Sequence, residues 1–210
     1  MGNFLQDISI KILPLLWAIT IHEVSHGWVA NRLGDPTARL AGRLTLNPLK
    51  HLDPMGMLAF FLTRMIGWAK PVPVDARNFR DPRRDMVWVA LAGPGSNFAM
   101  ALVSTAIYHA MLPSMQSMGA GGGRSILLPV FLMVRWSVLI NAILGIFNLV
   151  PIPPLDGGRV LVGVLPERAA EKYSRIEPYG FFIVIALLFT GILTTFIGPI
   201  YGDFVSLLHI

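Results

Sequence analysis

The sequence contains no cysteine and few charged residues. Both features restrict the class of protein and the kind of metal site that the chain can form. Without cysteine there is neither a disulfide nor a thiolate ligand, so any bound metal must be held by histidine and carboxylate side chains. Charged residues make up only 14% of the 210 residues, whereas hydrophobic residues make up 54% and the mean hydropathy is +0.61. These proportions are untypical of soluble domains and indicate a membrane protein.

Four apolar stretches are long enough to cross a bilayer, because a spanning helix needs about 20 mostly apolar residues. They lie near residues 6–31, 86–112, 127–149 and 180–208. The N-terminus has no basic region and no small-residue cleavage site of a signal peptide, so we expect the first stretch to be retained as a span.

A fifth apolar stretch, at 55–68, is too short for a confident span and carries Arg64 in its middle. The sequence WAKPVPVDARNF follows it, and its prolines favour an extended edge or turn. We interpret the region near 55–75 as re-entrant, interfacial or β-like. The predicted fold is an all-α polytopic membrane protein with about four transmembrane helices and this additional segment, forming a single membrane-embedded domain over 1–210.

Basic residues are distributed unevenly between the loops. Ten of them lie in 32–85 and four in 151–179, whereas 113–126 contains only Arg124. The positive-inside rule therefore places the loops at 32–85 and 151–179 in the cytoplasm and both termini outside. Because the basic residues lie between apolar stretches, the net charge of +5 indicates membrane orientation, and we expect no nucleic-acid partner.

The first apolar stretch contains the sequence IHEVSHGW. At 3.6 residues per turn, His22 and His26 lie one turn apart on nearly the same helix face, so both imidazoles can reach one ion. The carboxylate of Glu23, beside the first histidine, is suited to take a proton from metal-activated water. In a soluble protein these residues can simply form an exposed polar face. Within a membrane span they would be unfavourable without a partner, which favours a functional cluster.

A catalytic zinc ion usually has three protein ligands and one position left for water. Asp156, in FNLVPIPPLDGGRV, is the best candidate for the third ligand. Proline and glycine interrupt the helix there, and a broken helix at membrane depth is tolerated where it lines a cavity. The alternative is that Asp156 only caps the next helix. The predicted topology favours the first interpretation, since it brings Asp156 and the two histidines to the cytoplasmic side.

Four separated blocks resemble, in the same order, motifs of the site-2 protease family of intramembrane zinc metalloproteases, in its compact prokaryotic branch without a PDZ domain. They are HEVSHGWVANRLGDPTARLAGRLTLNPLKHLDPMG, GWAKPVPVDARNFRDPRRD, LAGPGSNFAM and FNLVPIPPLDGGRVL. The resemblance implies one zinc ion per chain, bound by His22, His26 and Asp156, with Glu23 as catalytic acid and base. It also implies hydrolysis of peptide bonds in transmembrane or membrane-associated protein substrates, in a prokaryotic plasma membrane.

Two asparagines match further positions of the family motifs. An amide donor near zinc can stabilise an oxyanion, and Asn148 is the better candidate because it lies near the end of the span that precedes Asp156. Asn97, in the AGPxxN motif, is the second candidate. The alternative for both is a hydrogen bond to a neighbouring backbone group. Among the other polar residues, His51 and Asp53 lie between proline and glycine, where turn roles are expected, and we leave them outside the zinc site.

Two other functions use the same residue types. A membrane metal-ion transporter also has intramembrane histidine and carboxylate ligands, but it does not need Glu23 and often has internal repeats, which the sequence lacks. A catalytically silent zinc-binding scaffold is the other alternative, and the intact Glu23 argues against it. Histidine and carboxylate also suit iron or cobalt, so zinc follows from ligand type together with the resemblance.

Overall fold

The computed structural model describes residues 2–63, 67–117 and 122–210 of the chain. Over these residues the regular structure is helical, apart from one isolated β-bridge between Leu52 and Ala69. The predicted all-α polytopic class is confirmed.

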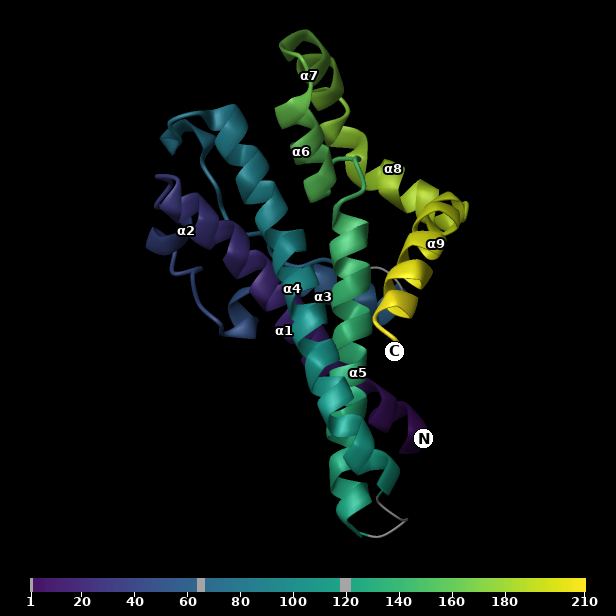
Figure 1. Ribbon diagram of the computed structural model, residues 1–210. Helices are drawn as coiled ribbons and strands as arrows, with labels where there is room; N and C mark the ends of the chain where they lie inside the picture. Colours follow the sequence, from purple (N-terminus) through teal and green to yellow (C-terminus); the bar gives the residue numbers. More distant parts are fainter. Residues whose placement is uncertain (1, 64–66, 118–121) are drawn as a thin grey trace.

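Three long helices form the central bundle: α1 (Gly2–Arg32), α4 (Pro82–Ser117) and α5 (Gly122–Asn148). Helix α4 packs along α5, and α1 packs against both (Figure 1). Each contains a segment long and apolar enough to cross a membrane, namely Ile8–Arg32, Pro82–Ser117 and Leu127–Asn148. These segments correspond to the first three predicted spans.

Helix α4 begins where the sequence supplies a reciprocal cap. The side chain of Asp81 accepts a hydrogen bond from the Arg84 backbone N–H at 3.1 Å, and the side chain of Asp85 accepts one from the Asp81 backbone N–H at 3.2 Å. Pro82 occupies the first helical position, where its missing N–H leaves no bond unmade. The local sequence therefore sets the point at which the chain enters the bundle.

The fourth predicted span, 180–208, is broken into α8 (Glu177–Phe189) and α9 (Ile192–Leu207), which are bent by 75°. The break lies at Gly191, whose φ of 75° falls in the left-handed region that glycine adopts readily. Both helices remain attached to the bundle through a buried cluster of apolar side chains. Its members are Ile146 of α5, Val184 of α8, and Leu193 and Ile197 of α9.

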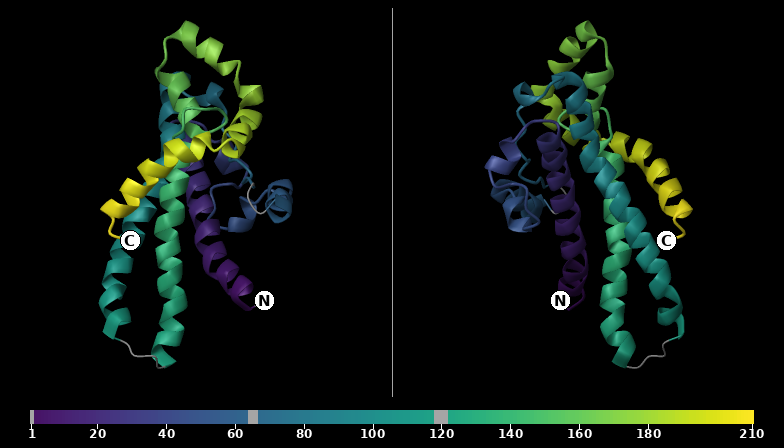
Figure 2. Two further views of the ribbon diagram at one scale, coloured as in Figure 1. Left: turned by 90° about the vertical axis from the view of Figure 1, so that its right-hand side faces the viewer. Right: turned by 60° about the vertical axis from the view of Figure 1, so that its left-hand side comes forward.

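Short elements fill the two loops that sequence analysis assigned to the cytoplasm. They are α2 (Thr37–Leu40), η1 (Pro48–Lys50), α3 (Pro54–Thr63) and η2 (Ala76–Asn78) in the first loop, and α6 (Asp156–Val164) and α7 (Glu167–Ser174) in the second. Helix α3 lies beside α1, outside the α1, α4 and α5 bundle (Figure 2). The predicted segment near 55–75 therefore begins with this helix, residues 64–66 lie outside the described residues, and no regular structure is assigned at 71–75.

The fully buried carboxylate of Asp35 joins the end of α1 to the segment before η2. It accepts hydrogen bonds from the Thr37 backbone N–H (3.1 Å) and hydroxyl, from the Asp75 backbone N–H (2.8 Å) and from the Asn78 amide (2.7 Å). Burial opposes ionisation, but these donors hold the pKa of Asp35 below its ordinary value of 3.8. The residues just before Asp75 are thereby fixed beside α1.

Candidate metal centre

Two buried imidazoles on α1 are each held by a hydrogen bond to α4. The Nδ1 atom of His26 lies 2.7 Å from the carbonyl oxygen of Val89, and the Nδ1 atom of His22 lies 2.6 Å from the side-chain oxygen of Asn97. Both partners accept hydrogen bonds, so each Nδ1 atom carries the proton. In the neutral rings each Nε2 atom then has a free lone pair, the form in which histidine binds a metal.

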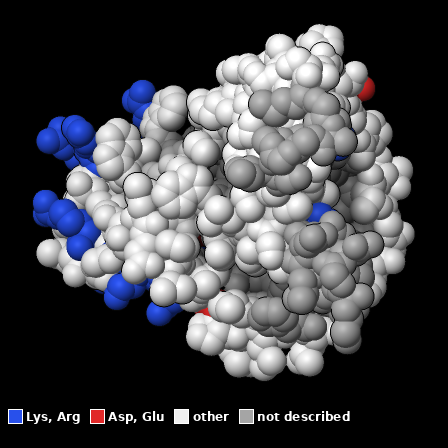
Figure 3. Space-filling view, turned by 90° about the horizontal axis from the view of Figure 1, so that it is seen from below, with Lys and Arg blue, Asp and Glu red and all other residues white. Residues whose placement is uncertain are grey.

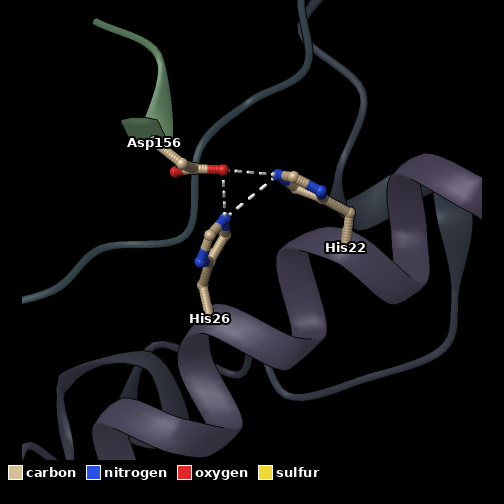
Figure 4. Close-up of side chains that lie close together, drawn as sticks. All are labelled: His22, His26 and Asp156. Carbon is tan, nitrogen blue, oxygen red and sulfur yellow. Dashed lines mark hydrogen bonds and ion pairs between the residues drawn. The ribbon is translucent and has the colours of Figure 1, made fainter. Parts of the chain in front are cut away.

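Asp156 is the first residue of α6, and its carboxylate points toward both imidazoles (Figure 4). Its Oδ2 atom lies 3.2 Å from His22 Nε2 and 3.3 Å from His26 Nε2. Leu155 occupies the cap position of α6, and no side-chain cap bond is formed there. The Asp156 side chain therefore faces the two imidazoles and does not merely cap its own helix.

The backbone after Asp156 is pressed against the turn that precedes it. A Cβ atom added to Gly157 would overlap the carbonyl groups of Leu149 and Val150, and one added to Gly158 would come within 2.6 Å of the Pro153 nitrogen. Only residues without a side chain fit such close backbone approach. The two glycines of LDGG thus allow α6 to begin directly beside the turn at 149–153, with the Asp156 side chain pointing toward α1.

The three converging atoms fit a tetrahedral metal ion. With bonds of about 2.0–2.1 Å, ligand atoms at tetrahedral angles lie roughly 3.3–3.4 Å apart. The two Nε2 atoms are 3.0 Å apart, and each is 3.2–3.3 Å from Asp156 Oδ2. The buried Oδ2 atom accepts no well-formed hydrogen bond from any described residue. Three lone-pair atoms this close repel one another unless a cation or a proton lies between them, and a metal ion would satisfy all three at once.

Glu23 follows His22 on α1 but is not one of the three converging residues. Its carboxylate accepts a hydrogen bond of 2.9 Å from the backbone N–H of Val72. Pro71 and Pro73 on either side have no N–H, so Val72 supplies the donor from this triplet. The segment around Val72, which was predicted to be extended, therefore bonds to Glu23 within the HEVSH sequence (an H-E-x-x-H motif) of α1.

Gly93 of α4 lies directly against both imidazoles. A Cβ atom added there would come within 2.6 Å of His22 Cε1 and 2.5 Å of His26 Cε1. Gly93 therefore permits the close approach of α4 to the imidazoles of α1. Gly95, two residues later, has open space around it.

The other polar residues singled out from the sequence form hydrogen bonds to nearby backbone groups. The side-chain amide of Asn148 donates to the Leu144 carbonyl oxygen at 2.9 Å, within its own helix. His51 is fully buried and bonds through Nε2 to the Thr45 carbonyl, and Asp53 accepts from the Gly56 backbone N–H at 2.8 Å. His51 and Asp53 therefore hold the loop through hydrogen bonds to its backbone, as expected for turn residues. The oxyanion role of Asn148 stays a prediction.

Asn141 of α5 also lies close to this cluster and was not predicted from the sequence. It is 1% exposed, and its side-chain oxygen accepts a 2.9 Å hydrogen bond from the amide of Asn97. An asparagine inside the apolar sequence VLINAILG is itself a signal, because polar side chains within spans are unfavourable unless they are paired.

A polytopic helical bundle with an H-E-x-x-H helix and a donor set suited to zinc defines the class of membrane zinc metalloproteases. The family model of peptidase family M50 matches residues 112–191. A Bacillus subtilis protein named "Putative zinc metalloprotease YwhC" is 38% identical over 182 residues, covering 85% of this chain and 80% of the relative. The chain therefore belongs to peptidase family M50 and is a zinc metalloprotease.

Two further relatives carry the name "Putative zinc metalloprotease Rip2". The one from Mycolicibacterium smegmatis is 30% identical over 193 residues, which is 89% of this chain and 70% of the relative. The one from Mycobacterium tuberculosis is 28% identical over 193 residues, again 89% of this chain and 68% of the relative. No solved structure matches the chain at a significant level.

Proposed function

We propose that the chain hydrolyses peptide bonds of transmembrane or membrane-associated proteins, at a centre where His22, His26 and Asp156 hold one zinc ion. The observation that carries this proposal is the convergence of two imidazole Nε2 atoms and one buried carboxylate oxygen, 3.0–3.3 Å apart. When bound there, zinc supplies Lewis-acid chemistry, acidifying water and polarising the scissile carbonyl.

The residues of the chain have separate tasks in this reaction. Glu23 takes a proton from the attacking water and delivers it to the leaving amine. The Val72 N–H, 2.9 Å from the Glu23 carboxylate, restricts the direction in which that carboxylate points. Asn148 is the candidate donor to the oxyanion, because its amide has a second N–H besides the one that donates to the Leu144 carbonyl.

The segment 71–76 is proposed to receive the substrate. A helical substrate has its backbone carbonyls bonded internally, so cleavage requires an unwound or extended stretch. Extended residues beside Glu23 offer such a stretch an edge to which it can add as a strand. Replacing residues 71–76 by an unrelated linker should slow cleavage while zinc remains bound. Unchanged cleavage kinetics in the folded variant would contradict the role of this segment.

The orientation in the membrane is proposed from charge: a prokaryotic plasma membrane, the active site toward the cytoplasm and both termini outside. Lys and Arg side chains gather on the side of the molecule where α2 lies in Figure 1 (Figure 3). Both termini lie lower than α2 in the view of Figure 1. Because the chain lacks cysteine, single substitutions can report topology. An impermeant thiol reagent added to intact cells should label Ser117→Cys but not Arg39→Cys, and the reverse pattern would overturn the orientation.

A single variant separates proteolysis from the alternatives. Glu23→Gln keeps the size of the side chain but removes the proton acceptor, so it should bind zinc as the wild type does and lose cleavage of a membrane substrate in proteoliposomes. If Glu23→Gln still cleaves, the assigned role of Glu23 is wrong. Zinc flux through wild-type protein in the same vesicles would instead favour the metal-ion transporter.

A further inference from the structure

A continuous chain of hydrogen-bonded polar side chains runs from the metal centre across α4 to α5, and all of them are buried except Ser137, which is half-buried. From His22 it passes through Asn97 and Asn141 to Ser137, and it ends at Ser104, which bonds to the Ser137 hydroxyl at 2.8 Å. Asn97 and Ser104 are seven residues apart on α4, and Ser137 and Asn141 are four apart on α5. The two members of each pair therefore lie on the same face of their helix. The two antiparallel helices thus face each other with two polar rungs.

Hydrogen bonding fixes which end of each amide points toward the metal centre. The Asn141 amide nitrogen donates to the Ser137 backbone carbonyl at 2.8 Å, and a carbonyl can only accept. The oxygen of Asn141 must therefore face Asn97, whose nitrogen donates to it at 2.9 Å and to the Ala18 carbonyl at 3.3 Å. Asn97 is left with its oxygen toward His22.

The direction of the Asn97 amide decides which ring nitrogen of the neutral His22 imidazole carries the proton. An oxygen at 2.6 Å from Nδ1 accepts the Nδ1 proton and leaves the Nε2 lone pair free. The reversed amide would donate to Nδ1 and require the proton on Nε2, where it would block ligation. Both donor positions of Asn97 are already used by Ala18 and Asn141, so this amide has no donor to offer an oxyanion.

We propose that Asn97 is a positioning residue that holds His22 in the metal-binding tautomer and orientation, and that Asn141 acts through Asn97 by fixing the direction of its amide. The proposal rests on the metal centre proposed above and adds to it residues on two helices that carry no ligand. Partners of ligating histidines typically change metal affinity by about 10- to 100-fold when they are lost.

The main test is zinc affinity, measured by competition with a chelator in purified detergent-solubilised protein. Asn97→Leu removes the acceptor with little change in volume and should weaken zinc binding about 10- to 100-fold. Asn97→Asp keeps an acceptor facing His22 Nδ1 and should stay within about threefold of wild type, although losing two donors lowers its thermal stability. Equal losses in both variants would mean that Asn97 only packs, and would overturn the proposal.

A second pair of variants tests the proposal without touching His22. Asn141→Leu should weaken zinc binding by about threefold or more, because the Asn97 amide nitrogen then keeps only its longer bond, to the Ala18 carbonyl. Ser104→Ala is the matched control, since it removes a buried hydrogen bond of the same chain that does not set the amide direction. Equal zinc affinity in Asn141→Leu and Ser104→Ala would refute the role of Asn141. This pair decides the question if neither Asn97 variant folds.

Cobalt substitution gives a readout that loss of stability alone does not move. The visible spectrum of bound Co²⁺ reports its ligand geometry, so it should change in Asn97→Leu and be retained in Ser104→Ala. His22→Ala, measured in the same way, separates the two proposals. If His22→Ala binds zinc as tightly as wild type, the metal centre itself is wrong. If it loses zinc while Asn97→Leu does not, only the positioning proposal fails.

Discussion

Gly93→Ala is expected to disable the proposed metal centre by adding a single methyl group. Ordinary contacts between carbon atoms are about 3.5–4.0 Å. The new Cβ would lie 2.6 Å from His22 Cε1 and 2.5 Å from His26 Cε1, so each ring must retreat by about 1 Å. Metal–ligand distances tolerate only about 0.2 Å. Neither imidazole can move so far and still share an ion with Asp156.

The effect on stability should be much smaller than the effect on metal binding. Overpacking typically costs about 1–3 kcal/mol, and replacing glycine by alanine within a helix returns roughly 1 kcal/mol. The metal-free variant should therefore lose no more than about 2 kcal/mol. Zinc affinity should fall at least about 100-fold, beyond the change expected on losing a hydrogen-bond partner of a ligand.

The matched control is Gly95→Ala, two residues along the same helix. A Cβ atom added at Gly95 meets nothing within 4 Å, so this variant should bind zinc normally and melt at or slightly above the wild-type temperature. Zinc affinity by chelator competition and melting of the metal-free protein would be measured for both. If Gly93→Ala binds zinc as tightly as Gly95→Ala, the close approach of α4 to the imidazoles is not as described.

Three further outcomes are expected. Zinc at about 100 times its dissociation constant should stabilise the wild type by about 2.7 kcal/mol but not His26→Ala, and equal stabilisation of both in thermal melts would place the ion elsewhere. Val72→Pro removes the N–H that Glu23 accepts, so cleavage should slow at unchanged zinc content; unaltered turnover would show that this bond does not orient the base. Because the folded pKa of Asp35 is lowered, its stabilisation is present above pH 3.8 and is lost as the pH falls through the folded pKa. Melts below pH about 4 should therefore show a shallower decline in Asp35→Asn than in wild type, and parallel curves would argue against this linkage.

What the sequence predicted well depends on local spacing. Two histidines four residues apart lie on one helix face in any helix, and long apolar stretches predict spans by length alone. Asp156 was predictable because the glycines after it interrupt an apolar region. The direction of the Asn97 amide was not predictable, since it is set by a carbonyl on α5 that becomes a neighbour only after folding. The buried role of Asp35 likewise depends on a backbone N–H forty residues away.

Helix α4 carries none of the proposed ligands, yet both halves of the metal centre are positioned against it. It holds the imidazoles through the Val89 carbonyl and Asn97. It also holds α6, because the Arg83 guanidinium donates to the Gly163 carbonyl at 3.0 Å, and Gly163 leaves no room for a Cβ atom beside the Val87 side chain. The distance from Asp156 to the histidines therefore depends in part on two separate contacts with one helix. Substitutions on the α4 faces that meet α1 and α6 should accordingly change metal affinity more than substitutions of equal size on its lipid-facing side.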